Sequence, residues 1–202
     1  MTSLDQLADN RELRRRIRRV LSVFRSIAVY MNVEAQDPHE SAMHLAGRVG
    51  AIGRAAVAPI STGMDLESLV LDELLAIGAQ RFPVVVGGPA VRLNAKAAEL
   101  MSLAIHELAT NAVKYGALSQ PEAELRVTWW IADQPVSRLH FAWAESGVRM
   151  TTGAARKSGF GYQLVNRLVG SELRGNGEML FLDGGVLCRI EIPLIEALHR
   201  HE

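Results

Sequence analysis

A carboxylate, a carboxamide and an ammonium group recur at regular spacing in the middle of the chain. Within residues 106–116, which read His-Glu-Leu-Ala-Thr-Asn-Ala-Val-Lys-Tyr-Gly, Glu107, Asn111 and Lys114 are four and three positions apart. An α-helix repeats every ~3.6 residues, so a helix here would place all three on one face. Carboxylate and amide oxygens suit Mg²⁺, and an ammonium suits phosphate. The stripe is a candidate nucleotide site, with the flat ring of Tyr115 beside it; the alternative is an ordinary solvated, ion-paired helix face.

Two glycine-containing segments favour the nucleotide interpretation. Residues 139–147 alternate like a strand and end in Glu145 and Gly147, which puts a carboxylate where the backbone can turn sharply. At 159–161 the run Gly-Phe-Gly opens a new helical pattern, and free backbone N–H groups at a helix start favour phosphate. Each segment alone is typical of a turn. Their order along the chain is far more specific.

These motifs resemble the ATP-binding domain of sensor histidine kinases of the HWE family, within the GHKL (Bergerat-fold) ATPases. That family is named for a His in its asparagine box and a Trp-x-Glu in its first glycine box. Here His106 begins His-Glu-Leu-Ala-Thr-Asn-Ala, and Trp143 and Glu145 bracket Trp-Ala-Glu. The resemblance continues through 159–161 and the closing strand 187–193, so it covers nearly the whole chain. It implies ATP and Mg²⁺ as ligands.

The resemblance implies a role for each polar motif residue. Glu107 would polarise the attacking group or a water, and Asn111 would ligate Mg²⁺. Lys114 would contact phosphate, and Tyr115 would pack against adenine. Glu145 stands where related domains place an Asp that accepts a hydrogen bond from the adenine amino group.

The resemblance also implies roles for the glycine-rich positions. Gly147 would let the base approach, while Gly159 and Gly161, on either side of Phe160, would shape a lid over the phosphates. Residues 147–158 are polar and are expected to form that mobile lid. One departure is that Val-Arg follows Gly147, where many relatives have a second glycine.

The first helical segment carries an arginine where the resemblance implies a histidine. Residues 11–21 resemble the family's His-Arg-Val-Lys-Asn box, and the phosphoryl-accepting position is occupied by Arg15. A guanidinium remains protonated because its pKa exceeds ~12, so it has no lone pair with which to attack. Self-phosphorylation at the usual position is therefore not expected. His44 is an alternative acceptor, although a lone histidine on a helix is more often a surface residue.

The arginine cluster around Arg15 forms a local basic patch in a chain whose net charge is +0. It could dock the acidic pocket of a response-regulator receiver domain through charge-assisted hydrogen bonds. It could equally serve only to solubilise an exposed helix. Nucleic-acid binding is not expected, because neither aromatic interleaving nor a reading helix is evident.

Two amphipathic helices are predicted ahead of the motifs. Apolar residues recur at spacings of three and four positions from Leu13 to Met31, as in an amphipathic helix. Asp37 is suited to cap a second helix, and Pro38 is suited to begin it. The apolar positions of the second helix are Ala42, Leu45, Ala46, Val49, Ile52 and Ala56. A homodimeric four-helix bundle would bury both stripes. Alternatively, the helices fold back on their own ATP-binding domain.

The remainder predicts an α+β sandwich. Asp65 and Asn94 can cap helices, and residues 82–86, 125–131, 139–143, 179–182 and 186–192 read as strands. The expected result is a mixed sheet covered by helices on one side, which the resemblance identifies as a Bergerat-type domain. Residues 59–63 break the pattern as a linker. We therefore predict a helical hairpin over 1–60 and an ATP-binding domain over 64–196.

Composition agrees with a soluble signalling protein. The 202 residues are 49% hydrophobic, and a single cysteine, Cys188, excludes an internal disulfide and is expected to fill the core. No apolar run approaches the ~18–20 residues of a membrane span, and the N-terminal segment is unlike a signal peptide. These features predict a cytoplasmic protein without a membrane partner.

Two functions remain open at this stage. The first is a degenerate histidine kinase, a homodimeric ATP-binding module that acts through partners, and Arg15 favours it. The second is a working kinase that phosphorylates a non-standard residue such as His44, or a partner such as a response regulator. Glu107 favours the second, because a pure binder has no need of a base.

Overall fold

The computed structural model of the protein describes residues 14, 17, 21, 38–57, 63–133, 135–149 and 159–198. It divides into two compact units, Met1–Leu45 and Ala46–Glu202, and the boundary falls inside helix α2 (Pro38–Val57). The helix begins at Pro38, as predicted. Most of the predicted first helix, the acceptor position Arg15, the linker residues 59–62 and the lid residues 150–158 lie outside the described residues.

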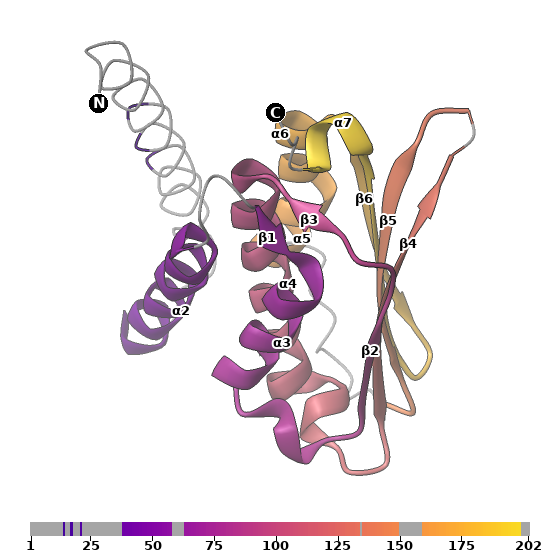
Figure 1. Ribbon diagram of the computed structural model, residues 1–202. Coiled ribbons are helices and arrows are strands. Elements are labelled where there is room, and N and C mark those ends of the chain that lie inside the picture. The colour runs from indigo at the N-terminus through magenta and orange to yellow at the C-terminus, as the bar shows by residue number, and fades with distance from the viewer. Residues whose placement is uncertain are drawn as a thin grey trace. The chain divides into compact units, whose positions relative to one another are not determined.

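The second unit contains a five-stranded sheet, shown edge-on in Figure 1. Its strands are β2 (Val84–Gly87), β4 (Glu124–Ala132), β5 (Arg138–Ser146), β6 (Asn176–Leu182) and β7 (Gly185–Pro193). Their order is β2-β4-β5-β7-β6, and β2 runs parallel to β4 while all other pairs are antiparallel. The predicted mixed sheet is confirmed, including the hairpin that turns at 183–184 between β6 and β7.

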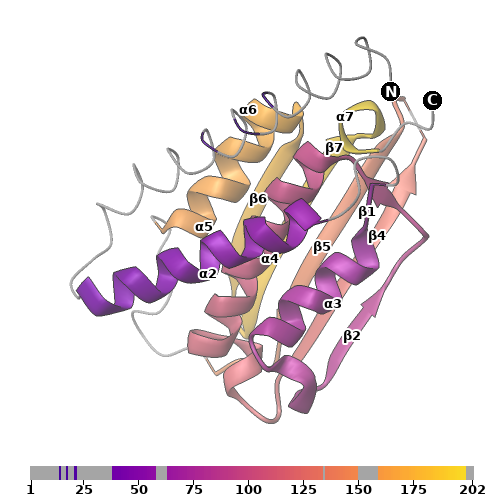
Figure 2. The same cartoon turned by 60° about the vertical axis from the view of Figure 1, so that its left-hand side comes forward.

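Helices of the second unit cover one face of this sheet (Figure 2). They are α3 (Leu66–Ala76), α4 (Ala95–Tyr115), α5 (Phe160–Gln163), the π-helical turn η3 (Leu164–Leu168) and α6 (Val169–Leu173). Shorter elements complete the unit: β1 (Met64–Asp65), η1 (Ala79–Arg81), β3 (Arg92–Leu93), η2 (Ala117–Ser119) and α7 (Leu194–Ala197). The α+β sandwich predicted from the sequence is therefore confirmed.

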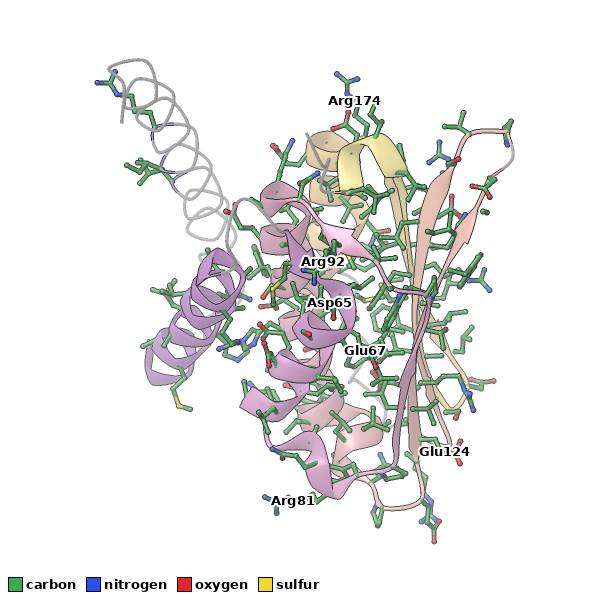
Figure 3. All side chains as sticks on the ribbon, viewed as in Figure 1. Asp65, Glu67, Arg81, Arg92, Glu124 and Arg174 are labelled. Carbon is green, nitrogen blue, oxygen red and sulfur yellow. The ribbon has the colours of Figure 1, made fainter. Side chains whose placement is uncertain are left out.

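Both predicted helix caps are present. The Asp65 carboxylate accepts the backbone N–H of Ser68 at 2.9 Å, and the Asn94 side-chain oxygen accepts that of Ala97 at 3.0 Å. Each satisfies an N–H group that has no partner inside its helix. Asp65 also pairs with Arg92 in the short β1–β3 ladder, and the two residues lie close together in Figure 3. These contacts fix where α3 and α4 begin.

The core lies between the helical layer and the sheet, and α4 runs through its centre. Most of the first eighteen residues of α4 are buried, as expected of a helix that has neighbours on several sides. Buried side chains of the sheet and of α5 include Val127, Trp143, Phe160, Cys188 and Ile190. Burial raises the pKa of the Cys188 thiol to about 12, so this cysteine fills the core as an uncharged group, as predicted.

The buried face of α2 within the second unit differs from the predicted one. Arg48, Ala51, Ile52 and Ala55 are buried, whereas Val49 is 38% exposed. Among the predicted apolar positions of this segment whose burial the structure describes, only Ile52 is buried. One reason is that α2 also meets α3 and α4 through the hydrogen bonds of Arg48 and Arg54, which an apolar periodicity does not detect. Residues 46–57 therefore belong to the second unit and contact α3 and α4.

In the part of the chain that the structure describes, no helix combines the length and apolar character needed to cross a bilayer.

Candidate functional site

The polar stripe of α4 is exposed at one end and buried at the other. Asn111, Lys114 and Tyr115 are exposed, and Tyr115 retains 53% of its accessible surface. Glu107, one turn before Asn111, is buried. From Glu107 to Tyr115 the helix rises about 12 Å, a length comparable to an extended nucleoside triphosphate. The exposed residues therefore lie at the solvent-facing end of the stripe, and Glu107 lies at its buried end.

Glu107 is buried because α2 and α5 both lie against it. The Arg48 guanidinium on α2 donates from Nε to Oε1 at 2.7 Å and from Nη2 to Oε2 at 3.1 Å. On the other side, a Cβ added at Gly161 would lie 3.0 Å from the Glu107 Cβ. This distance is tighter than ordinary van der Waals contact, so glycine at 161 lets α5 approach α4 closely here.

Glu145 lies at the other end of the candidate site, at the end of β5. Its Oε1 accepts the indole N–H of Trp143 at 3.0 Å, and its Oε2 accepts the backbone N–H of Ala117 at 2.8 Å. Trp143 and Glu145 are two positions apart on a strand, so their side chains share a face. The Trp-x-Glu spacing therefore has a local physical reason: the tryptophan holds the carboxylate. Burial raises the pKa of Glu145, and the two hydrogen bonds only partly oppose this.

Glycines make room for Glu145 on two sides. A Cβ at Gly116 would lie 1.9 Å from the Glu145 Oε2, and one at Gly185 would lie 2.1 Å from the Glu145 backbone oxygen. Real Cβ atoms do not approach so closely, so neither position accepts a side chain without displacing Glu145. Gly147 has φ 71°, a left-handed conformation that favours glycine. The sequence predicted a need for Gly147 but not for the other two.

A second buried polar cluster ties α2, α3 and α4 together. Glu73, 1% exposed, accepts two hydrogen bonds from Arg54, at 3.0 and 2.5 Å, and one from the Ser102 hydroxyl at 2.7 Å. His106 Nδ1 lies 3.3 Å from Glu73 Oε2, an ion-pair distance without hydrogen-bond alignment. A Cβ at Gly47 would lie 2.5 Å from His106 Nε2. His106 thus packs between α2 and Glu73.

The donor set fits magnesium held mainly by a nucleotide. Among the described residues, no three His, Cys, Asp or Glu side chains come together as a metal cluster would. Asn111 is exposed, and its amide makes no hydrogen bond within the described ranges. Mg²⁺ commonly takes one or two protein oxygens and completes its shell with phosphates and waters. Asn111 would hold the ion, which would neutralise charge on the phosphates.

Two residues at this site were not identified from the sequence. Arg48 lies 59 positions from Glu107, and Glu73 lies on α3, for which the sequence indicated only the cap Asp65. One signal was available for Arg48: it is a charged residue within the small, apolar run Leu-Ala-Gly-Arg-Val-Gly-Ala. A charge in such a run is typical of a buried pair, but its partner cannot be read from spacing.

The chain is similar to histidine kinases. It is 30% identical over 185 residues to a blue-light-activated histidine kinase of Rhizobium johnstonii, covering 90% of this chain and 52% of that protein. A blue-light-activated histidine kinase of Brucella ovis is 28% identical over 192 residues, with 92% of this chain and 39% of that protein covered. The chain thus spans about half or less of the length of these relatives. No protein-family model matches it.

Solved structures share the fold. The histidine kinase domain of Erythrobacter litoralis EL346 blue-light activated histidine kinase superposes with a TM-score of 0.58 at 17% identity, covering 88% of this chain and 95% of that one. A longer structure of the same protein gives a TM-score of 0.60 at 18% identity, with 96% and 61% covered. The likeness extends over the α+β sandwich described above.

Proposed function

Because the chain belongs to the histidine kinases, we propose that it binds ATP with Mg²⁺ against α4 and acts as a degenerate kinase of the HWE type. The observation that carries this proposal is the junction at the end of α4. There Glu145 accepts the N–H of Ala117, two residues beyond Tyr115. The acid of the Trp-x-Glu motif and the exposed stripe of α4 therefore lie next to each other.

Each end of the site would bind a different part of the nucleotide. Tyr115 would pack against the purine, and Glu145 would accept a hydrogen bond from its amino group through a lone pair that Trp143 and Ala117 leave available. Asn111 would hold the metal ion, and the Lys114 ammonium would contact phosphate. Gly147 would let the base approach, and Gly159 and Gly161 would bring the backbone beside Phe160 close to the phosphates.

The signalling role follows from the acceptor position. With Arg15 in place of a histidine, the chain lacks a nucleophile at the usual site. ATP would then act as a conformational ligand of a homodimer, which would regulate a partner such as a receiver domain. A ligand has this effect only if it binds two conformations with different affinity.

Catalysis is the second candidate, and Glu107 supports it. In hydrolysis, the oxygen of water would bond to the γ-phosphorus as the bond to the bridging oxygen of ADP breaks. Glu107 would take the proton of the water, and the products would be ADP and phosphate. Transfer to His44 or to a partner would follow the same scheme, with the acceptor atom in place of the water oxygen.

Nucleotide titration tests the proposed site. We expect wild-type protein to bind ATP by calorimetry in the presence of Mg²⁺, and Asn111→Ala to bind at least about tenfold more weakly, or ~1.4 kcal/mol. Asn176→Ala is the matched control, because Asn176 is exposed at the start of β6. Equal weakening in both variants, or no binding by the wild type, would contradict the site.

Labelled ATP distinguishes the two candidates. With γ-labelled ATP and Mg²⁺, the degenerate kinase acquires no label on the chain although it binds nucleotide. Acid-labile label that disappears in His44→Ala would establish the active kinase instead.

A further inference from the structure

Arg48 joins two parts of the proposed site that are far apart in the sequence. Its guanidinium forms a forked pair with Glu107, and the two side chains are only 3% and 9% exposed. The guanidinium carbon also lies 4.0 Å from the centroid of the Phe160 ring. Phe160 is the first residue of α5 and is 2% exposed. One buried arginine therefore contacts both the proposed catalytic acid and the Gly-Phe-Gly run.

This contact keeps Glu107 away from a nucleophile. A general base needs a lone pair within hydrogen-bond reach of the proton that it takes. Here each carboxylate oxygen accepts a charged N–H, and Arg48, Phe160 and Gly161 surround the group.

The contact depends on the docking of α2. Arg48 belongs to the segment 46–57, which is held on the unit by Arg54 to Glu73 and by the Ser102 hydroxyl to the Ala51 carbonyl at 2.8 Å. When this segment lies against α4, Arg48 covers Glu107. When the segment moves away, the arginine leaves with it.

We propose that Arg48 is a positioning residue that withholds Glu107 from the reaction, and that displacement of residues 46–57 from α4 makes Glu107 available. The inference rests on the proposed function, in which the nucleotide binds beside Glu107. Helix α2 is then the element through which the activity of the site is regulated.

Removing the fork should increase ATP turnover. Mg²⁺-ATP hydrolysis by Arg48→Met, which keeps an apolar stem of similar length, is expected to show kcat raised about tenfold or more with KM within about twofold. Arg48→Lys keeps the charge but loses the fork, so its gain should be smaller. The matched control is Arg174→Met, because the Arg174 guanidinium pairs with Glu196 of α7 at 3.7 Å, and it should leave kcat unchanged.

A double variant shows whether Glu107 carries the gain. In Arg48→Met/Glu107→Gln the increase should be lost. The inference is overturned if Arg48→Met binds ATP yet turns it over no faster than wild type, if Arg174→Met gains as much, or if the gain persists without Glu107. A lower kcat in Arg48→Met would also overturn it, since Arg48 would then orient Glu107 for catalysis.

Two further outcomes are separable by the same measurements. If Arg48→Met does not fold by circular dichroism, Arg48→Lys is judged by the same criteria. Absence of ATP binding in every protein, measured by calorimetry, would refute the proposed function and this inference with it. Intact binding without any gain refutes the inference alone.

Discussion

Two buried carboxylates of the second unit, Glu73 and Glu145, differ in the kind of partner that holds them. Burial raises the pKa of Glu73, but the contacts with His106, Arg54 and Ser102 outweigh it, so the pKa lies below its ordinary value. Burial also raises the pKa of Glu145, and its partners are only an indole N–H and a backbone N–H, so the pKa stays above that value. An ionised carboxylate is stable inside this protein where a cation accompanies it.

The opposite pKa shifts of Glu73 and Glu145 correspond to their different positions in the fold. Glu73 belongs to the junction of α2, α3 and α4, where a permanent charge pair fixes one helix on others. Glu145 lies at the end of a strand beside the exposed stripe of α4, where a carboxylate with neutral partners keeps acceptor capacity for a ligand. The first arrangement suits a structural contact and the second suits recognition.

The largest expected effect comes from removing the cation from Glu73. Arg54→Met leaves a nearly inaccessible carboxylate without its charge partner and should lower the free energy of unfolding by about 3 kcal/mol. Urea denaturation measures this. Adding Glu73→Gln to Arg54→Met removes the uncompensated charge and should restore more than half of the loss. A loss for Arg54→Met below ~1 kcal/mol would mean that the pair does not govern stability.

A smaller effect is expected from the donor that holds Glu145. Trp143→Phe removes the N–H that Glu145 accepts, and Trp129→Phe is its matched control, because the Trp129 indole donates to the Pro89 carbonyl at 2.8 Å. Both variants shrink a buried ring, but only Trp143 donates to a carboxylate. Its loss should therefore cost about 1 kcal/mol more unfolding free energy near neutral pH. Equal costs in the two variants would mean that the hydrogen bond from Trp143 to Glu145 stabilises the fold no more than the one from Trp129 to Pro89.

The two carboxylates should give opposite pH dependences. Glu73, whose pKa is lowered, contributes stability that is present above the ordinary value of 4.5 and is lost as pH falls through its folded pKa. Glu145, whose pKa is raised, contributes stability that is present below 4.5 and is lost as pH rises through its folded pKa. Unfolding free energies across this range for wild type, Glu73→Gln and Glu145→Gln test both signs. If the unfolding free energies of the three proteins depended on pH in the same way, the opposite contributions of Glu73 and Glu145 would be refuted.

The smallest effect concerns a buried ionisable group whose pKa only burial shifts. The Cys188 thiol, with its pKa raised to about 12, should remain protonated at pH 8 and resist thiol reagents in the native protein. Absorbance with a disulfide reagent should show full reaction only in denaturant. Rapid reaction of the native protein would mean that β7 opens easily.

Local signals predicted the elements of the fold well. The caps Asp65 and Asn94 and the β6–β7 hairpin depend on residues within a few positions of one another, so the sequence shows them directly. The pairing of Arg48 with Glu107 joins residues 59 positions apart, and the partners of Glu145 include a backbone group. Such contacts arise only when the chain is folded, and residue spacing does not contain them.

The face that α2 buries illustrates the same limit. Apolar periodicity selected Val49 and Ile52, and the structure buries Ile52 but not Val49. It also buries Arg48, because the Glu107 carboxylate on α4 accepts hydrogen bonds from the Arg48 guanidinium. The periodicity of one helix reports the chemistry of its own side chains and not that of the surface it meets. The motif residues of α4 were predicted together because they share a single helix.

The continuity of α2 has a mechanical consequence. The boundary between the two units falls after Leu45, within an unbroken helix, and Arg48 follows it by less than one turn. A hydrogen-bonded helix transmits torque along its axis, with no loop at the boundary to absorb it. A rotation of α2 about its axis would therefore move the Arg48 side chain sideways across α4 and change its distance from Glu107.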